Sequence, residues 1–190
     1  MKRIYLTCAV ILIFTSCSPK KNNVATGYED YYFGMTINQI YEKQPFLRIV
    51  DEINVDDDYI DLGINGNQFY AMTQFLYDEE LVPEIKHPAI ALQKNITVYL
   101  GDRWPGFFIQ NSKLIGIGFA REGEVLQELI NVYGEGFLYG EQIVWNDSGR
   151  LIVWLKMESN PIEMVFYFDE QWVRDISNEI MKKHREARSP

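Results

Sequence analysis

The fold is decided by the stretch Gln142–Phe168, which reads QIVWNDSGRLIVWLKMESNPIEMVFYF. Three apolar segments in it are separated by two turn signals, one at residues 147–149 and one at 159–161. Short turns rich in Asp, Ser, Gly, Asn and Pro join antiparallel strands. Alternation in the last segment places four apolar side chains on one face, namely Ile162, Met164, Phe166 and Phe168. The stretch therefore predicts a three-stranded antiparallel meander.

The segments on either side extend this pattern. Residues 107–119 predict a further hairpin, and an amphipathic helix is expected over 124–133 with Gly134 as its left-handed cap. The apolar face of that helix comprises Val125, Leu126, Leu129, Ile130 and Tyr133. Asp169 is placed to cap a last helix. The apolar stripe of this last helix comprises Trp172, Val173, Ile176 and Ile180.

The first half is less regular. Thr36 and Gln39 form a capping box, and Pro45 ends the short helix that follows near residue 43 or 44. Strands are expected at 46–50 and 68–77, with a loop or hairpin near 59–64 and a loop over 78–88. Together these elements predict an α+β domain, in which an antiparallel sheet meander has its helices packed on one face.

The amino terminus has the layout of a secretory signal peptide, because Lys2 and Arg3 precede a short apolar run that ends at Phe14. The run is shorter than the 20 or so residues a spanning helix needs. We therefore expect residues 1–16 to be a signal peptide, 17–27 a flexible tether, 28–184 one globular domain and 185–190 a frayed tail. A weak subdivision near 78–90 is an alternative.

Phe14-Thr15-Ser16-Cys17 resembles the lipobox of bacterial lipoproteins. The resemblance implies cleavage before Cys17, a diacylglycerol thioether on that residue and an amino terminus acylated by a fatty acid such as palmitate. It also implies a membrane partner, reached through the lipid on Cys17. Because no acidic residue follows Cys17 directly, the same resemblance favours the outer membrane with the domain facing the periplasm. The alternative is an ordinary signal peptide that leaves a secreted protein.

Two short segments suggest a family. Residues 33–36 before one helix and 132–134 before strands carrying Trp145 are similar to small envelope lipoproteins of the β-lactamase-inhibitor-protein fold. Proteins of that group, including outer-membrane assembly lipoproteins, are built as helix-then-strands units in tandem. The resemblance implies a binding or scaffolding role with an envelope protein as partner.

Composition excludes other classes of function. The formal charge of −9 argues against nucleic acid, which requires a basic surface. The two histidines, His87 and His184, lack metal-ligand spacing, and none of the common nucleophile or phosphate-binding motifs is present. No metal, cofactor or catalytic residue is therefore expected. The acidic segment 51–61 fails the EF-hand spacing, so a solvated loop is favoured over calcium binding.

The aromatic residues offer one candidate binding site. Trp104 lies in a turn that also carries Asp102, and Trp104 with Tyr99 or Phe107 could stack on a sugar ring or on a partner's side chain. The alternative is that Trp104 packs on the sheet. Three functions follow, in decreasing order of expectation: a non-catalytic module that binds an envelope protein, a lipoprotein that binds carbohydrate or another small ligand, and a hydrolase with an unrecognised site.

Overall fold

A computed structural model describes residues 30–49, 66–77, 96–100, 105–156 and 161–189. Several expectations lie outside these residues. They are the signal peptide and Cys17, the acidic segment 51–61, the hairpin near 59–64, the loop over 78–88, the turn at 159–161 except Pro161, and Asp102 and Trp104.

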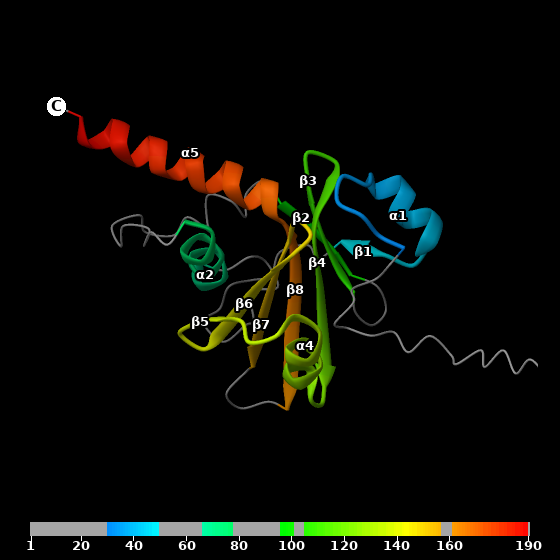
Figure 1. Cartoon of the computed structure of the whole chain (residues 1–190). Helices are drawn as coiled ribbons and strands as arrows, with labels where there is room; N and C mark the ends of the chain where they lie inside the picture. The colour runs from blue at the N-terminus through cyan, green and yellow to red at the C-terminus, as the bar shows by residue number, and fades with distance from the viewer. Residues whose placement is uncertain (1–29, 50–65, 78–95, 101–104, 157–160, 190) are drawn as a thin grey trace, which may run out of the picture.

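The described elements are four helices and eight strands (Figure 1). The helices are α1 (Ile37–Lys43), α2 (Gly66–Tyr77), α4 (Val125–Tyr133) and α5 (Glu170–Arg188). The strands are β1 (Arg48–Ile49), β2 (Ile96–Leu100), β3 (Gly106–Gln110), β4 (Lys113–Glu122), β5 (Phe137–Tyr139), β6 (Gln142–Asp147), β7 (Arg150–Lys156) and β8 (Ile162–Asp169).

All eight strands form one antiparallel sheet with the order β1-β2-β3-β4-β8-β7-β6-β5. Each half of the chain contributes a meander, and the last strands of the two halves, β4 and β8, pair at the centre. The α+β class and the antiparallel meander expected from the sequence are thus confirmed.

Two tight hairpins have the geometry that their sequences predict. Ser148 and Gly149 have φ angles of 53° and 82°, and Asp147 pairs with Arg150 across the turn. Positive φ at both central residues matches the right-handed twist of the flanking strands. Asn111 and Ser112 do the same between β3 and β4, with φ angles of 50° and 63°.

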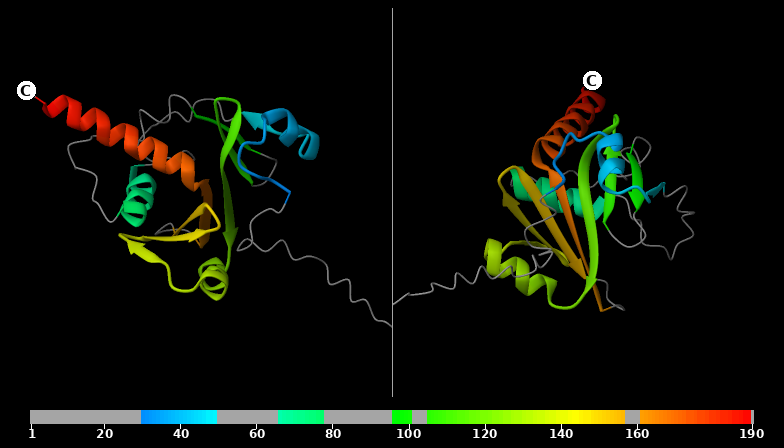
Figure 2. Two further views of the ribbon diagram at one scale, coloured as in Figure 1. Left: turned by 45° about the horizontal axis from the view of Figure 1, so that its top comes forward. Right: turned by 90° about the vertical axis from the view of Figure 1, so that its right-hand side faces the viewer.

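Helices cover both faces of the sheet, which corrects the expectation of a single covered face (Figure 2). We call the side under α2 and α5 the α2–α5 face, and its core includes Phe69, Phe108, Phe166, Phe168 and Trp172. We call the other side the α1–α4 face, and its core includes Ile40, Phe107, Phe119, Leu129 and Tyr167. The uninterrupted apolar runs of β7 and β8 follow from this, because a strand buried on both faces does not alternate.

Two glycines of β4 allow the aromatic core of the α2–α5 face to pack against the backbone. A Cβ atom at Gly116 would lie 2.4 Å from Cδ1 of Phe168, and one at Gly118 would lie 2.9 Å from Cδ1 of Phe166. Both distances are far shorter than a van der Waals contact. The rings of Phe166 and Phe168 are stacked with centroids 6.1 Å apart, and Phe108 packs edge-on against both.

Residues 68–77, expected as a strand, belong to helix α2. Buried positions Phe69, Met72 and Thr73 recur at helical spacing, and they meet the α2–α5 face together with α5. Two strands were not predicted, β2 and the three-residue β5. The last helix continues to Arg188, within the segment expected to fray.

The predicted helix ends are confirmed where the structure describes them. Thr36 and Gln39 form both hydrogen bonds of the capping box, and Asp169 accepts from the backbone N–H of Gln171. Gly134 ends α4 with a φ angle of 78°. The start of α4 has no local side-chain cap. Instead, Glu163 of β8 accepts from the backbone N–H of Leu126 at 2.8 Å, so the sheet supplies the cap.

Candidate functional site

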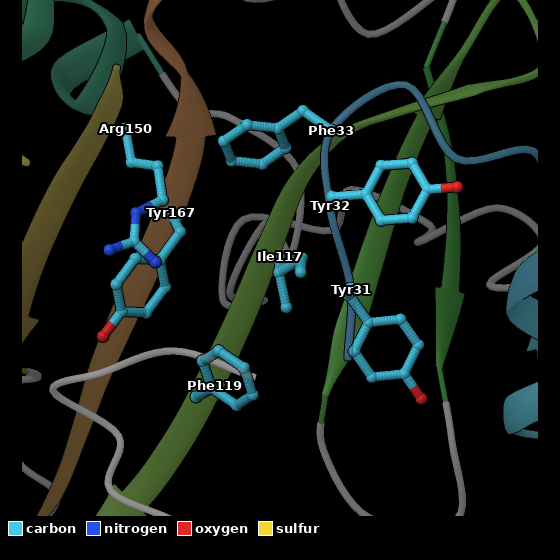
Figure 3. A pocket seen from close by; sticks show the side chains of 7 residues that line it. All are labelled: Tyr31, Tyr32, Phe33, Ile117, Phe119, Arg150 and Tyr167. Atoms are coloured by element: carbon cyan, nitrogen blue, oxygen red, sulfur yellow. The ribbon is translucent and has the colours of Figure 1, made fainter. Parts of the chain in front are cut away.

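A pocket of about 250 Å³ opens on the α1–α4 face (Figure 3). One wall is the segment Tyr31–Phe33, which precedes α1. Ile117 and Phe119 of β4 form the floor, and Tyr167 of β8 and Arg150 of β7 form the opposite wall. Five of the seven lining residues are aromatic. The rings of Phe33, Phe119 and Tyr167 lie on the pocket side, whereas those of Tyr31 and Tyr32 point away from Arg150 and Tyr167 (Figure 3), so three rings can contact an apolar ligand.

The backbone of the first wall is held by the start of β4. Gly34 donates a hydrogen bond to the carbonyl of Leu114 at 2.8 Å, and Leu114 donates to the carbonyl of Met35 at 2.8 Å. Gly34 has a φ angle of 87°, which glycine adopts without strain. The wall is therefore fixed to the sheet just before α1 begins.

The two tyrosines of this wall are also held by α1. Tyr31 donates from its hydroxyl to Oε1 of Gln44 at 3.2 Å, and its ring lies 4.9 Å from that of Phe107. Gln39 donates from Nε2 to the hydroxyl of Tyr32 at 3.4 Å. Tyr32 is 59% exposed, and it stands at the rim of the pocket.

Phe119 on the floor and Tyr167 on the far wall are buried, uncharged aromatic residues. Their rings meet edge-on with centroids 5.9 Å apart. Burial raises the pKa of Tyr167 far above its ordinary value, and the nearby phenol of Tyr133 raises this pKa further. Burial also raises the pKa of Tyr133. Both phenols are therefore neutral at physiological pH.

Arg150 is the one charged residue among the seven that line the pocket. It begins β7 directly after the Ser148-Gly149 turn, which sets it opposite Asp147. Arg150 donates from Nη2 to the carboxylate of Asp147 and from Nε to the backbone carbonyl of the same residue at 3.4 Å. Nη1 donates no hydrogen bond to the described residues, and the side chain is 35% exposed. A guanidinium has five N–H donors, so a ligand can still be bound.

This arrangement suits binding. An aromatic enclosure provides contact area, and a single guanidinium provides orientation. The lining contains no histidine, no cysteine and no carboxylate. Among the residues that the structure describes, no three His, Cys, Asp or Glu side chains gather as a metal ion would require.

Of the candidate site proposed from the sequence, the structure describes Tyr99 and leaves its companions Asp102 and Trp104 outside the described residues. Tyr99 belongs to β2 and packs edge-on against Tyr41 of α1, with ring centroids 6.2 Å apart, and it does not line the pocket. The sequence did carry a signal for the pocket, the run of three aromatic residues at 31–33. Nothing in the sequence linked that run to Arg150.

Comparisons with protein-family models, curated proteins and solved structures found no match to this chain. None of the helices in the described part of the chain is long and apolar enough to cross a membrane.

Proposed function

We propose that this protein is a lipid-anchored module of the bacterial envelope that binds a small, mainly apolar ligand without transforming it. The observation that carries the proposal is the pocket of aromatic side chains between the segment before α1 and the centre of the sheet. It takes up the small-ligand function, which ranked second among those expected from the sequence, and assigns it to this pocket instead of Trp104. The anchor rests on the lipobox-like residues that end at Cys17.

The pocket size limits the ligand. Sites for drug-sized molecules occupy about 300 to 1,000 Å³, so this pocket accommodates one ring with a short substituent. The wall at Tyr31–Phe33 is preformed, because Tyr31 bonds to Gln44 and Tyr32 to Gln39, and this keeps the ordering cost of binding low.

A second candidate function is binding of an envelope protein along a sheet edge. The outermost strands β1 and β5 each carry an exposed apolar side chain, Ile49 at 46% and Leu138 at 66% exposure. Edge strands pair readily with another chain through their backbone hydrogen-bonding groups. Purification from detergent extracts should then recover a stoichiometric partner that a Leu138→Lys variant loses. A Gln127→Lys variant, changed at an exposed position of α4, should retain that partner.

Ligand binding is tested by titrating the domain with 3-phenylpropanol and following protein NMR shifts. Phe33→Ala should weaken binding about threefold to tenfold, which is the contribution of one aromatic contact, because the Phe33 ring faces the far wall of the pocket. Phe46→Ala is the matched control, because Phe46 is 75% exposed and does not line the pocket. Shifts that are absent, or that are equally weakened in the two variants, would count against a site at the pocket.

The anchor is tested by mass spectrometry of the mature amino terminus. Intact protein from the membrane fraction should begin at Cys17 and carry the mass of a diacylglycerol and an acyl chain. A Cys17→Ser variant should be recovered without that mass. Wild-type protein that begins elsewhere with no added lipid would contradict the proposal of an anchor.

A further inference from the structure

We infer that the pocket selects a ligand with a single ring and a carboxylate, in which Phe33, Phe119 and Tyr167 contact the ring and Arg150 binds the carboxylate. This inference rests on the proposed function, because it names the ligand class for the same pocket. Its basis is the position of one guanidinium on the wall of an otherwise uncharged aromatic enclosure.

The net charge of the chain and the local charge at the pocket have opposite signs. The chain carries a formal charge of −9, so its overall field opposes an anionic ligand. Any preference for a carboxylate must therefore come from a local cation. Arg150 is the charged lining residue, and the neighbouring phenol of Tyr167 stays neutral because burial raises its pKa.

The guanidinium of Arg150 retains capacity for further hydrogen bonds. Nε and Nη2 of Arg150 donate to the backbone carbonyl and the carboxylate of Asp147, whereas Nη1 donates to none of the described residues. The side chain is 35% exposed, so a ligand at the pocket can reach it. Asp147 also fixes the guanidinium in place, which lowers the entropy cost of forming the next hydrogen bond.

The position of Arg150 disfavours a cationic ligand. Aromatic enclosures bind quaternary ammonium groups when the rings face the cation and no positive charge lies beside it. Here Arg150 lies beside the ring of Tyr167 (Figure 3). A ligand ammonium would have to approach this guanidinium, whereas a carboxylate would be attracted to it.

The test compares three ligands that share a ring and a chain length: 3-phenylpropionate, 3-phenylpropanol and 3-phenylpropylamine. The acid should bind about five- to tenfold more tightly than the alcohol, because a charge-assisted hydrogen bond replaces a neutral one at a partly exposed site. The amine should bind most weakly. Equal affinity for acid and alcohol, or tightest binding of the amine, would overturn the inference while leaving the proposed function intact. Binding of none of the three would overturn both.

Variants assign the preference to Arg150. Arg150→Gln should reduce the affinity for the acid to that for the alcohol and leave the alcohol within about twofold. Arg174→Gln is the matched control: Arg174 is equally exposed at 35% and paired with Glu170, but it lies on α5, on the other side of the sheet. A preference that persists in Arg150→Gln, or that also disappears in Arg174→Gln, would contradict the inference.

Salt dependence gives a test that does not rely on folding of the variant. In the wild-type protein, raising the ionic strength should change the affinity for the acid, because salt screens both the attraction by Arg150 and the repulsion by the net charge, and should leave the affinity for the alcohol unchanged. A response that is the same for both compounds would contradict a role for the guanidinium.

Discussion

The two faces of the sheet bury similar apolar residues but differ in how they are completed. On the α2–α5 face, stacked phenylalanine rings pack directly on glycines of β4. Helices α2 and α5, which are joined by a hydrogen bond, cover these rings. Ser177 of α5 and Thr73 of α2 make this link, with their hydroxyl oxygens 3.0 Å apart.

On the α1–α4 face, the two helices sit over different parts of the sheet (Figure 1). The segment before α1 and the wall formed by β7 and β8 leave the aromatic pocket between them. The comparison indicates a division of roles, in which the α2–α5 face supplies stability and the α1–α4 face supplies a binding site.

The largest expected effect comes from Phe168 in the centre of the α2–α5 face. Phe168→Ala should lower the free energy of unfolding by about 3 to 5 kcal/mol, because it removes a fully buried ring and leaves a cavity. Urea unfolding followed by circular dichroism measures the loss. Tyr32→Ala, at the rim of the pocket, should change stability by no more than about 0.5 kcal/mol. Similar losses in both variants would contradict the division of roles.

Two glycine substitutions sharpen the comparison. Gly116→Ala should cost about 1 to 3 kcal/mol of unfolding free energy, because the added methyl group would overlap the buried ring of Phe168. On the α1–α4 face, a Cβ at Gly136 would lie 2.4 Å from Cγ2 of Ile143. Gly136→Ala should cost less, since Gly136 lies outside the strands and its backbone can shift. A Phe168→Leu change should partly rescue Gly116→Ala, and a lack of rescue would show that the ring is not the obstacle.

Each face also contains one buried polar link, and these should differ in strength. Glu163 accepts from Leu126 N–H and from Trp154 Nε1, both at 2.8 Å. Glu163→Ala leaves two donors without their acceptor and should cost about 1 to 3 kcal/mol of unfolding free energy. Ser177→Ala removes neutral hydrogen bonds and should cost about 1 kcal/mol. Denaturant unfolding of both variants measures the difference. A larger loss of unfolding free energy in Ser177→Ala than in Glu163→Ala would contradict the stronger role given to Glu163.

The smallest effect is a pH dependence at the start of α5. A hydrogen bond from Asn146 and the neighbouring Arg174 guanidinium hold the pKa of Glu170 below its usual value. A lowered folded-state pKa stabilises the protein above the unfolded pKa of about 4.3, and this contribution is lost as the pH falls through the folded value. Glu170→Gln should therefore be less stable by about 0.5 kcal/mol near neutral pH. The difference should disappear on acidification.

The control for this effect is the same substitution in an Asn146→Ala background, where the pH-dependent difference should shrink. Asp169 must be kept unchanged in all variants. Burial raises the pKa of Asp169, so its titration acts in the opposite direction. Urea midpoints measured between neutral and acidic pH would reveal both trends. A difference between wild type and Glu170→Gln that grows on acidification would contradict the assigned sign.

The sequence predicted those parts of the fold that depend on neighbouring residues. The Ser148-Gly149 turn, the capping box at Thr36 and the left-handed Gly134 are each fixed by the backbone preferences of a few adjacent residues. Residues 68–77 show the limit of such signals. Their aromatic content favoured a strand, and only packing against α5 and the sheet decides that they form a helix.

The sequence by itself determined an antiparallel meander with short turns and capped helices, because turns and caps act over a few residues. Tertiary structure alone decided that helices cover both faces, since a continuous apolar strand shows that it is buried without showing what buries it. It also decided the pocket, which brings Tyr31–Phe33 of the first half next to Arg150 and Tyr167 of the second. That meeting depends on the central pairing of β4 with β8, a long-range contact that no local pattern encodes.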